Sequence, residues 1–306
     1  MKEITNRHAI LVMAHNQFEI LEKIIKVLDH ERIDFYVHID KKVKDYNINK
    51  LYKIPKKSQL YLTDRINVIW GDYSQIECEL MLLKKSSSNQ NYQYYHLISG
   101  TDLPLKNIEY ILNFFDKNKG TEFVHFCQYG ECDKRILQRV DKYYFHFKKG
   151  NHLTSKIHHL LDYIQKKLNI SRTSNSDLIY SYGANWFSIT DELTNFVIKN
   201  EKMIRKNFRY SLCADELFLQ TLVYNSSFYE KTYFKKYNIP ESDYHSICRC
   251  IDWNRGEPYV WKTDDFDELI TSDYLFARKF DINEDSKIID LILSHVCNKQ
   301  RDEKSE

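Results

Sequence analysis

Short apolar runs alternate with amphipathic segments along the first 126 residues of the chain. Each apolar run has the length of a buried strand, and the segments between them carry apolar residues three and four positions apart, which is typical of helices. Strands are therefore predicted at residues 8–15, 34–40, 66–70, 94–99 and 122–126, and helices at 18–28, 75–86 and 107–116. This alternation predicts an α/β fold with a mostly parallel central sheet flanked by helices.

The stretch 182–221 continues the pattern and carries a candidate base. An apolar strand at 186–189 leads into a helix that starts at Thr190, and a second apolar helix opens at Ala214 with Asp215 and Glu216 in its first turn. The helix dipole keeps a carboxylate ionised at that position. A general base must be ionised at working pH and rigidly supported, so Glu216 is a candidate. The alternative is that both acids are ordinary helix-start residues.

Polar residues stand at successive predicted strand ends. His15 and Asn16 follow the first strand, His38 and Asp40 close the second, and Asp102 follows the strand at 94–99. Ligands bind at the carboxyl ends of parallel strands, so the group is a candidate binding edge. Each residue alone also fits a turn or a helix cap. The sequence contains neither a GxGxxG fingerprint nor a P-loop.

Composition and charge narrow the choices. The 45 basic and 43 acidic residues give a net charge of +2, which does not favour nucleic acid as a partner. Seven scattered cysteines, an odd number, indicate reduced thiols in a cytosolic protein rather than a disulfide or zinc framework. The apolar run at 9–14 is too short for a signal peptide or a membrane span.

The middle of the chain is basic and aromatic. Residues 130–150 suit sugar stacking, an anionic partner or a solvated loop. Residues 154–168 form an amphipathic basic helix, which either rests on a membrane surface or packs on its own domain. Further on, Arg278 and Lys279 form a basic pair in an apolar frame, which suits a fixed phosphate site. The charged residues 298–306 are expected to be frayed.

Several motifs together resemble one enzyme family. They are ILVMAHN, YVHIDKK, VIWGDYSQIECELMLLK, YYHLISGTDLPLK, GANWFSIT, CADELFLQT, RCIDW and LFARKFD, in that order between residues 8 and 282. The chain resembles the core-2/I-branching β-1,6-N-acetylglucosaminyltransferase and peptide O-xylosyltransferase family (glycosyltransferase family 14). The resemblance implies a GT-A-like fold and an inverting transfer from a UDP-sugar to a glycan hydroxyl, without a metal. It implies a single glycosyltransferase domain, with a nucleotide-sugar-binding half at 1–126 and an acceptor and catalytic half at 127–297.

The resemblance also assigns roles. It makes Glu216 the base and places Lys279 against the donor diphosphate, with Lys262 or Arg255 as a second cation. The expected donor side comprises His15, Asn16, His38, Asp40, Asp102, Arg255, Lys262, Arg278 and Lys279. The expected acceptor side comprises Glu131, Arg139, Lys142, Trp186 and Asp215.

The expectation of no metal or other cofactor has a basis in the residues. Many nucleotide-sugar enzymes hold a divalent ion with Asp-x-Asp at a strand end, whereas here the strand at 94–99 is followed by Asp102 alone. The only Asp-x-Asp, Asp265-Phe266-Asp267, lies in the acidic first turn of a predicted helix, so we interpret it as a helix start.

Animal members of the family carry a membrane anchor, a stem and many disulfides. We expect this chain to be a bacterial cytoplasmic relative without them, working on surface polysaccharide, at the inner face of the membrane if the acceptor is lipid-linked. N-acetylglucosamine is the favoured donor sugar, and galactose, galactofuranose and xylose remain open. A glycan- or nucleotide-binding protein without activity is the alternative from another class. The oligomeric state is left open.

Overall fold

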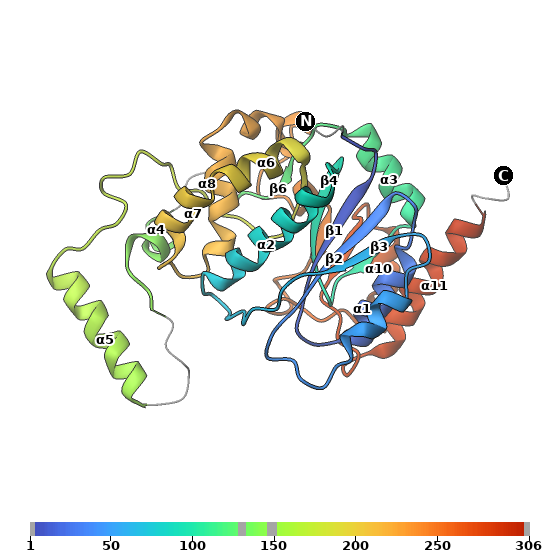
Figure 1. The fold of residues 1–306 in the computed structure, drawn as a ribbon, viewed down its shortest axis with the longest axis horizontal. Helices are drawn as coiled ribbons and strands as arrows, with labels where there is room; N and C mark the ends of the chain where they lie inside the picture. The colour runs from blue at the N-terminus through green and yellow to red at the C-terminus, as the bar shows by residue number, and fades with distance from the viewer. Residues whose placement is uncertain (1–3, 128–132, 146–151, 303–306) are drawn as a thin grey trace.

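A six-stranded sheet forms the centre of the protein. The computed structural model describes residues 4–127, 133–145 and 152–302 (Figure 1). The sheet has the order β3-β2-β1-β4-β7-β6, in which the first four strands pair in parallel and the last two are antiparallel to their neighbours. Its strands are β1 (His8–Ala14), β2 (Ile33–Ile39), β3 (Gln59–Leu62), β4 (Tyr94–Ser99), β6 (Phe123–Val124) and β7 (Phe187–Thr190).

Helices cover both faces of this sheet. In β1, Ile10 and Val12 face one hydrophobic core, while Ala9 and Leu11 face the other. Because both faces of β1 are buried, its sequence is an apolar run. The first core is covered by α1 (Phe18–Val27), α3 (Ile108–Lys117), α10 (Phe266–Thr271) and α11 (Ser286–Asp302). The second is covered by α2 (Ser74–Asn89), α6 (Asp191–Lys199), α7 (Glu201–Phe208) and α8 (Phe218–Tyr224). The predicted α/β class with a mostly parallel, helix-flanked sheet is confirmed.

A small second sheet brings the end of the chain to the middle of the fold. Its order is β5-β9-β8, formed by β5 (Leu103–Pro104), β8 (Arg249–Ile251) and β9 (Phe276–Arg278). Because β5 follows β4 almost directly, β9 lies beside the carboxyl end of a central strand. The remaining elements are α4 (Lys134–Asp141), α5 (His152–Lys167), α9 (Tyr233–Tyr237) and the 3-10 turns η1 (Ile48–Lys53), η2 (Ala214–Glu216), η3 (Ser227–Lys231), η4 (Tyr244–Ile247) and η5 (Thr263–Asp265).

The predicted strand at residues 66–70 is wrong. The third strand is β3, at Gln59–Leu62, and the segment 66–70 is a loop whose last residue, Trp70, is 79% exposed. Hydrogen bonds to side chains, rather than pairing with a neighbouring strand, hold this loop. His38 Nε2 accepts the Ile66 N–H at 3.2 Å, and Asp40 Oδ2 accepts the Val68 N–H at 3.0 Å. The apolar run is therefore a loop fastened to the end of β2.

Two helix boundaries also differ from expectation. The helix predicted to open at Ala214 is a short 3-10 turn, η2, and the α-helix begins only at Phe218. Asp215 and Glu216 thus precede α8 and do not lie in its first turn. At the end of the chain, α11 continues to Asp302, so the first part of the expected frayed segment is helical.

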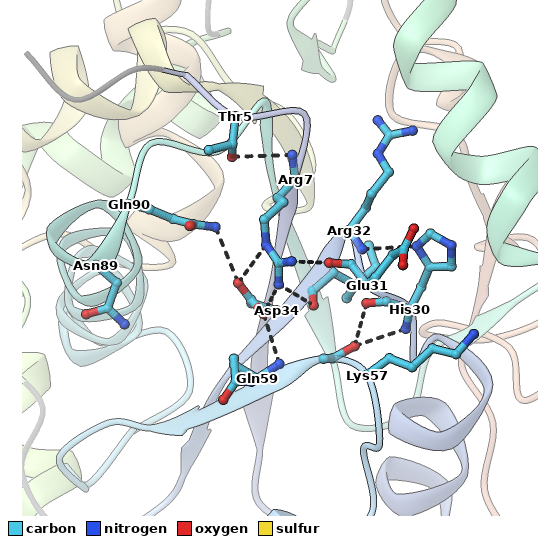
Figure 2. A network of polar contacts seen from close by, with 12 residues as sticks. Thr5, Arg7, His30, Glu31, Arg32, Asp34, Lys57, Gln59, Asn89 and Gln90 are labelled. Carbon is cyan, nitrogen blue, oxygen red and sulfur yellow. Dashed lines mark hydrogen bonds and ion pairs between the residues drawn. The ribbon is translucent and has the colours of Figure 1, made fainter.

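A polar network ties the strands together at their amino ends (Figure 2). Arg7 forms an ion pair with Asp34, which is 3% exposed. The Asp34 carboxylate also accepts the Gln59 N–H at 2.9 Å and the Tyr92 hydroxyl at 2.8 Å. These contacts join the starts of β2 and β3 to the residues that precede β1 and β4. The opposite, carboxyl edge carries the polar strand ends singled out in the sequence.

Candidate active site

The four polar residues at the ends of β1 and β2 fall into two pairs that differ in exposure. His15 and Asn16 are exposed at the carboxyl edge, where a ligand can reach them. His38 and Asp40 are 1% and 2% exposed. Their side chains accept backbone N–H groups of the 66–68 loop, as described above. His38 and Asp40 therefore support the 66–68 loop from inside the protein, whereas His15 and Asn16 are exposed to solvent.

At the end of β4, the buried Asp102 lies beside Arg278, whose side chain is 16% exposed. Asp102 is 1% exposed, and its carboxylate accepts the Ser99 N–H at 3.0 Å and the Ser99 hydroxyl at 2.6 Å. Arg278 Nε lies 3.7 Å from Asp102 Oδ1, and the Arg278 guanidinium lies 4.1 Å above the ring of Trp186. Burial lowers the pKa of Arg278 and the charge of Asp102 opposes that change. The Asp102 carboxylate thus positions the Arg278 side chain.

Lys279 is held at the same edge by its neighbours in the chain. The Phe280 N–H donates to the Thr101 carbonyl at 3.0 Å, and the Lys279 carbonyl accepts the Trp261 N–H at 3.1 Å. Gln17, directly after the β1 end, donates to Asp281 at 2.6 Å. The structure therefore brings the basic pair of the sequence next to the ends of both β1 and β4.

The two candidates for a second cation differ sharply. Arg255 forms ion pairs with Asp252, with Asp265 at 2.6 Å and with Glu268 at 3.4 Å, and it stacks 4.2 Å from the Tyr259 ring. Its charge is thus already offset by three carboxylates. Lys262 is exposed. Lys262 is therefore the better placed of the two to meet an anion.

Glu216 is held by a guanidinium. Arg139 Nη1 donates to Glu216 Oε2 at 2.8 Å, and the two side chains are 27% and 29% exposed. Burial raises the pKa of Glu216, while Arg139 and a hydrogen bond from Tyr182 oppose that rise. The expectation that a helix dipole keeps this carboxylate ionised is corrected, because η2 is a separate short turn. The charge of Arg139 is what favours the ionised form of Glu216.

The segment 183–186 connects Glu216 to the basic pair Arg278–Lys279. The Gly183 N–H donates to the Glu216 carbonyl at 3.0 Å, and Asn185 Nδ2 donates to Asp215 Oδ2 at 3.4 Å. The next residue, Trp186, stacks on Arg278. Glycine is required at 183 because a Cβ there would lie 1.9 Å from the His125 carbonyl oxygen. Asn185 thus contacts the turn that contains Glu216, and Trp186 contacts Arg278, the residue before Lys279.

Of the residues expected on the acceptor side, Arg139 forms an ion pair with Glu216, and Asp215 precedes Glu216 in the same turn. Glu131 lies outside the described residues. Lys142 donates to the Ile170 carbonyl and lies 3.5 Å from Asp141, so its charge is engaged elsewhere. Trp186 is 8% exposed and Asp215 is 5% exposed. Both side chains are thus largely buried, and their contact with an acceptor stays a prediction.

Sequence reasoning missed several residues around Glu216. Tyr182 opposes the rise in the pKa of Glu216, and Asn185 and Gln75 donate hydrogen bonds to Asp215. Two indoles are strongly exposed: Trp70, whose neighbour Gly71 accepts the Cys213 N–H at 2.8 Å, and Trp253, at 50%. Trp70 escaped notice because its apolar run was interpreted as a buried strand.

Metal-binding and membrane-spanning features can be checked over the described part of the chain. Within residues 4–127, 133–145 and 152–302, no three His, Cys, Asp or Glu side chains come together as a metal site. Asp265 of the Asp-x-Asp is engaged by Arg255 and by the Lys262 N–H at 2.8 Å. Over these same residues, no helix combines the length and the apolar character needed to cross a membrane.

Helix α5 presents apolar residues to solvent. In Figure 1 it stands apart from the sheet and its covering helices. Leu160, Tyr163 and Leu168 are 57%, 61% and 66% exposed, whereas Gln165 is buried and hydrogen-bonds the backbone of Tyr143. The apolar face of this part of the helix is therefore uncovered.

Comparison with known proteins identifies the class. A model of the Core-2/I-Branching enzyme family matches residues 9–271. The chain belongs to the Core-2/I-Branching enzyme family, and this membership favours an enzyme over a protein that only binds glycans.

The curated relatives are much longer than this chain. Xylosyltransferase 2 of Rattus norvegicus is 23% identical over 310 aligned positions, which cover 95% of this chain and 34% of that protein. Xylosyltransferase 2 of Homo sapiens is 22% identical over 306 positions, with the same coverage. The chain thus spans about a third of their length. Among solved structures, apo mouse xyloside xylosyltransferase 1 shares 7% identity at a TM-score of 0.36, over 89% of this chain and 96% of that one.

Proposed function

We propose that this chain transfers a sugar from a UDP-sugar to a hydroxyl group of a glycan acceptor, with inversion, without a metal and with Glu216 as general base. One observation carries the proposal. The adjacent residues Asn185 and Trp186 contact Asp215 and Arg278, and so join the turn that presents Glu216 to the strand end that presents Lys279. A candidate base and a cationic group are thus carried by connected segments.

The base side suits proton removal from an acceptor. Glu216 is partly exposed, and Arg139 counteracts the effect of burial on its pKa. As the acceptor oxygen bonds to the anomeric carbon, the bond from that carbon to the diphosphate oxygen breaks, and Glu216 takes the acceptor proton. The exposed indole of Trp70, beside the Gly71–Cys213 contact, offers a flat apolar surface for a sugar ring.

The donor side suits a leaving diphosphate. Lys279 and Lys262 can offset the charge that develops on the departing UDP, which is the work a divalent ion does in other enzymes. Arg278 is screened by Asp102 and Trp186, so we assign it the support of Lys279 rather than a direct contact. His15 and Asn16, exposed at the end of β1, would contact the nucleotide.

Two donor sugars have specific support. The resemblance to branching enzymes favours N-acetylglucosamine, whereas the similarity to proteins named xylosyltransferase favours xylose. A surface polysaccharide of a bacterium is the acceptor class we propose.

The test is UDP release from a panel of UDP-sugars with EDTA present throughout. Release from one donor would name the sugar and support a metal-independent reaction. Glu216→Gln should lower turnover by about 10²–10⁴-fold while donor binding is kept. The matched control is Glu192→Gln, which removes an exposed carboxylate from the start of α6. Near-normal turnover in Glu216→Gln would refute the role of Glu216, and release that needs added metal would refute metal independence.

A further inference from the structure

A second carboxyl group lies buried behind the base. Glu79, in α2, is 0% exposed, and neither of its carboxylate oxygens has a hydrogen-bond partner among the described residues. Within that part of the chain it forms no ion pair. The titratable groups that interact with it electrostatically are Asp215 and its neighbour Cys78. None of these interactions offsets a negative charge on Glu79.

An ionised carboxylate is very costly in such a place. A buried charge without a hydrogen bond or a counter-ion keeps its proton instead. Burial, and then the nearby Asp215, raise the pKa of Glu79 well above its ordinary value. A protonated carboxyl group is a hydrogen-bond donor, and it needs an acceptor.

Asp215 supplies the matching acceptor. Its Oδ2 is held by Gln75 Nε2 at 2.7 Å and by Asn185 Nδ2 at 3.4 Å, whereas its buried Oδ1 has no partner among the described residues. Gln75 and Glu79 stand four positions apart in α2, so they lie on the same face of the helix. Helix α2 packs against η2. The hydrogen bond from Gln75 to Asp215, together with the electrostatic effect of Asp215 on Glu79, indicates that the Glu79 carboxyl group lies near Asp215.

We propose that Glu79 is a positioning residue, which donates a hydrogen bond from its protonated carboxyl group to Oδ1 of Asp215 and so holds the turn that presents Glu216. The inference rests on the proposed role of Glu216 as base. Gln75, Asn185 and Glu79 then saturate the Asp215 carboxylate from α2 and from the segment before β7. A neutral Glu79 also adds no negative charge beside the base.

The activity test compares two variants of similar size. Glu79→Leu removes the donor and should lower kcat by about tenfold or more with the donor KM little changed, because the sugar-nucleotide contacts lie on other elements. Glu79→Gln keeps an N–H donor in the same place, and it should restore most of that loss. Wild-type kcat in Glu79→Leu would overturn the proposal. A Glu79→Gln variant as impaired as Glu79→Leu would also overturn it, because the glutamate would then act through its charge.

A spectroscopic test does not depend on activity. Infrared difference spectra of wild type minus Glu79→Gln at neutral pH should show the C=O stretching band of an un-ionised carboxyl group. Absence of that band would overturn the proposal even if Glu79→Leu fails to fold. If the band is present but no UDP-sugar is turned over, the proposed function fails while the protonation of Glu79 stands.

Discussion

Arg139 should set the pH at which Glu216 becomes an effective base. Its Nη1 lies 2.8 Å from Glu216 Oε2, and both side chains are less than a third exposed. Two opposite charges about 4 Å apart interact by about 4 kcal/mol at an effective dielectric constant of about 20, and partial exposure reduces this figure. A charge-assisted hydrogen bond of about 1.5–3 kcal/mol is a reasonable net value. Arg139→Met removes this interaction and keeps the length of the side chain.

The sign of the effect follows from the base mechanism. Without Arg139, burial dominates and the pKa of Glu216 rises further, so the carboxylate is protonated at higher pH than in the wild type. The acid limb of the kcat profile should move to higher pH. On that limb the variant should be slower by about tenfold to a hundredfold. At pH values well above this limb, the kcat of Arg139→Met should lie within a few fold of the wild-type kcat.

The assay is UDP release at saturating donor and acceptor across the pH range in which the protein stays folded. Arg135→Met is the matched control, because Arg135 lies four positions earlier in α4, is 90% exposed and pairs with Asp133. Its profile should coincide with that of the wild type. An acid limb of Arg139→Met at unchanged or lower pH would refute the reasoning. An equal loss at every pH would instead make Arg139 an acceptor contact.

Two further changes test the donor side and helix α5. Lys279→Met should lower kcat/KM for the UDP-sugar by about tenfold to a hundredfold through the loss of a charge-assisted phosphate contact, while Lys287→Met, an exposed lysine of α11, should leave it unchanged. Equal behaviour of the two variants would remove Lys279 from the donor site. If α5 contacts a membrane, the wild type should co-sediment with vesicles containing phosphatidylglycerol, and replacing Leu160 and Leu168 by Asp should weaken this by at least about tenfold per leucine. Equal sedimentation of the two proteins would show that α5 does not insert its apolar face.

The sequence predicted the sheet well where burial and apolar pattern coincide. β1, β2 and β4 are buried on both faces, so each is a mostly apolar run. The rule failed at residues 66–70, where an equally apolar run is a loop held by His38 and Asp40. β3 escaped prediction because it is only four residues long and half of it is partly exposed. Periodicity cannot show which backbone groups will find side-chain partners.

The sequence predicted which residues belong to the candidate site better than it predicted which groups those residues contact. Glu216 and the Arg278–Lys279 pair were singled out from the sequence, and the structure places them on connected segments. Whether Arg255 or Lys262 is available to an anion could not be read from the chain, because the three carboxylates around Arg255 become neighbours only on folding. The same holds for Asp215, whose burial follows from packing against α2.

The sequence by itself thus determined the α/β class, the family and the chemical types of residue at the carboxyl edge of the sheet. These follow from local patterns, since strand and helix periods and short motifs involve neighbours in the chain. Only the tertiary structure decided the partners of the charged groups. Arg139 meets Glu216 across 77 positions and Gln75 meets Asp215 across 140. Ionisation depends on burial and on charges a few ångströms away, and distances of that kind exist only after the chain has folded.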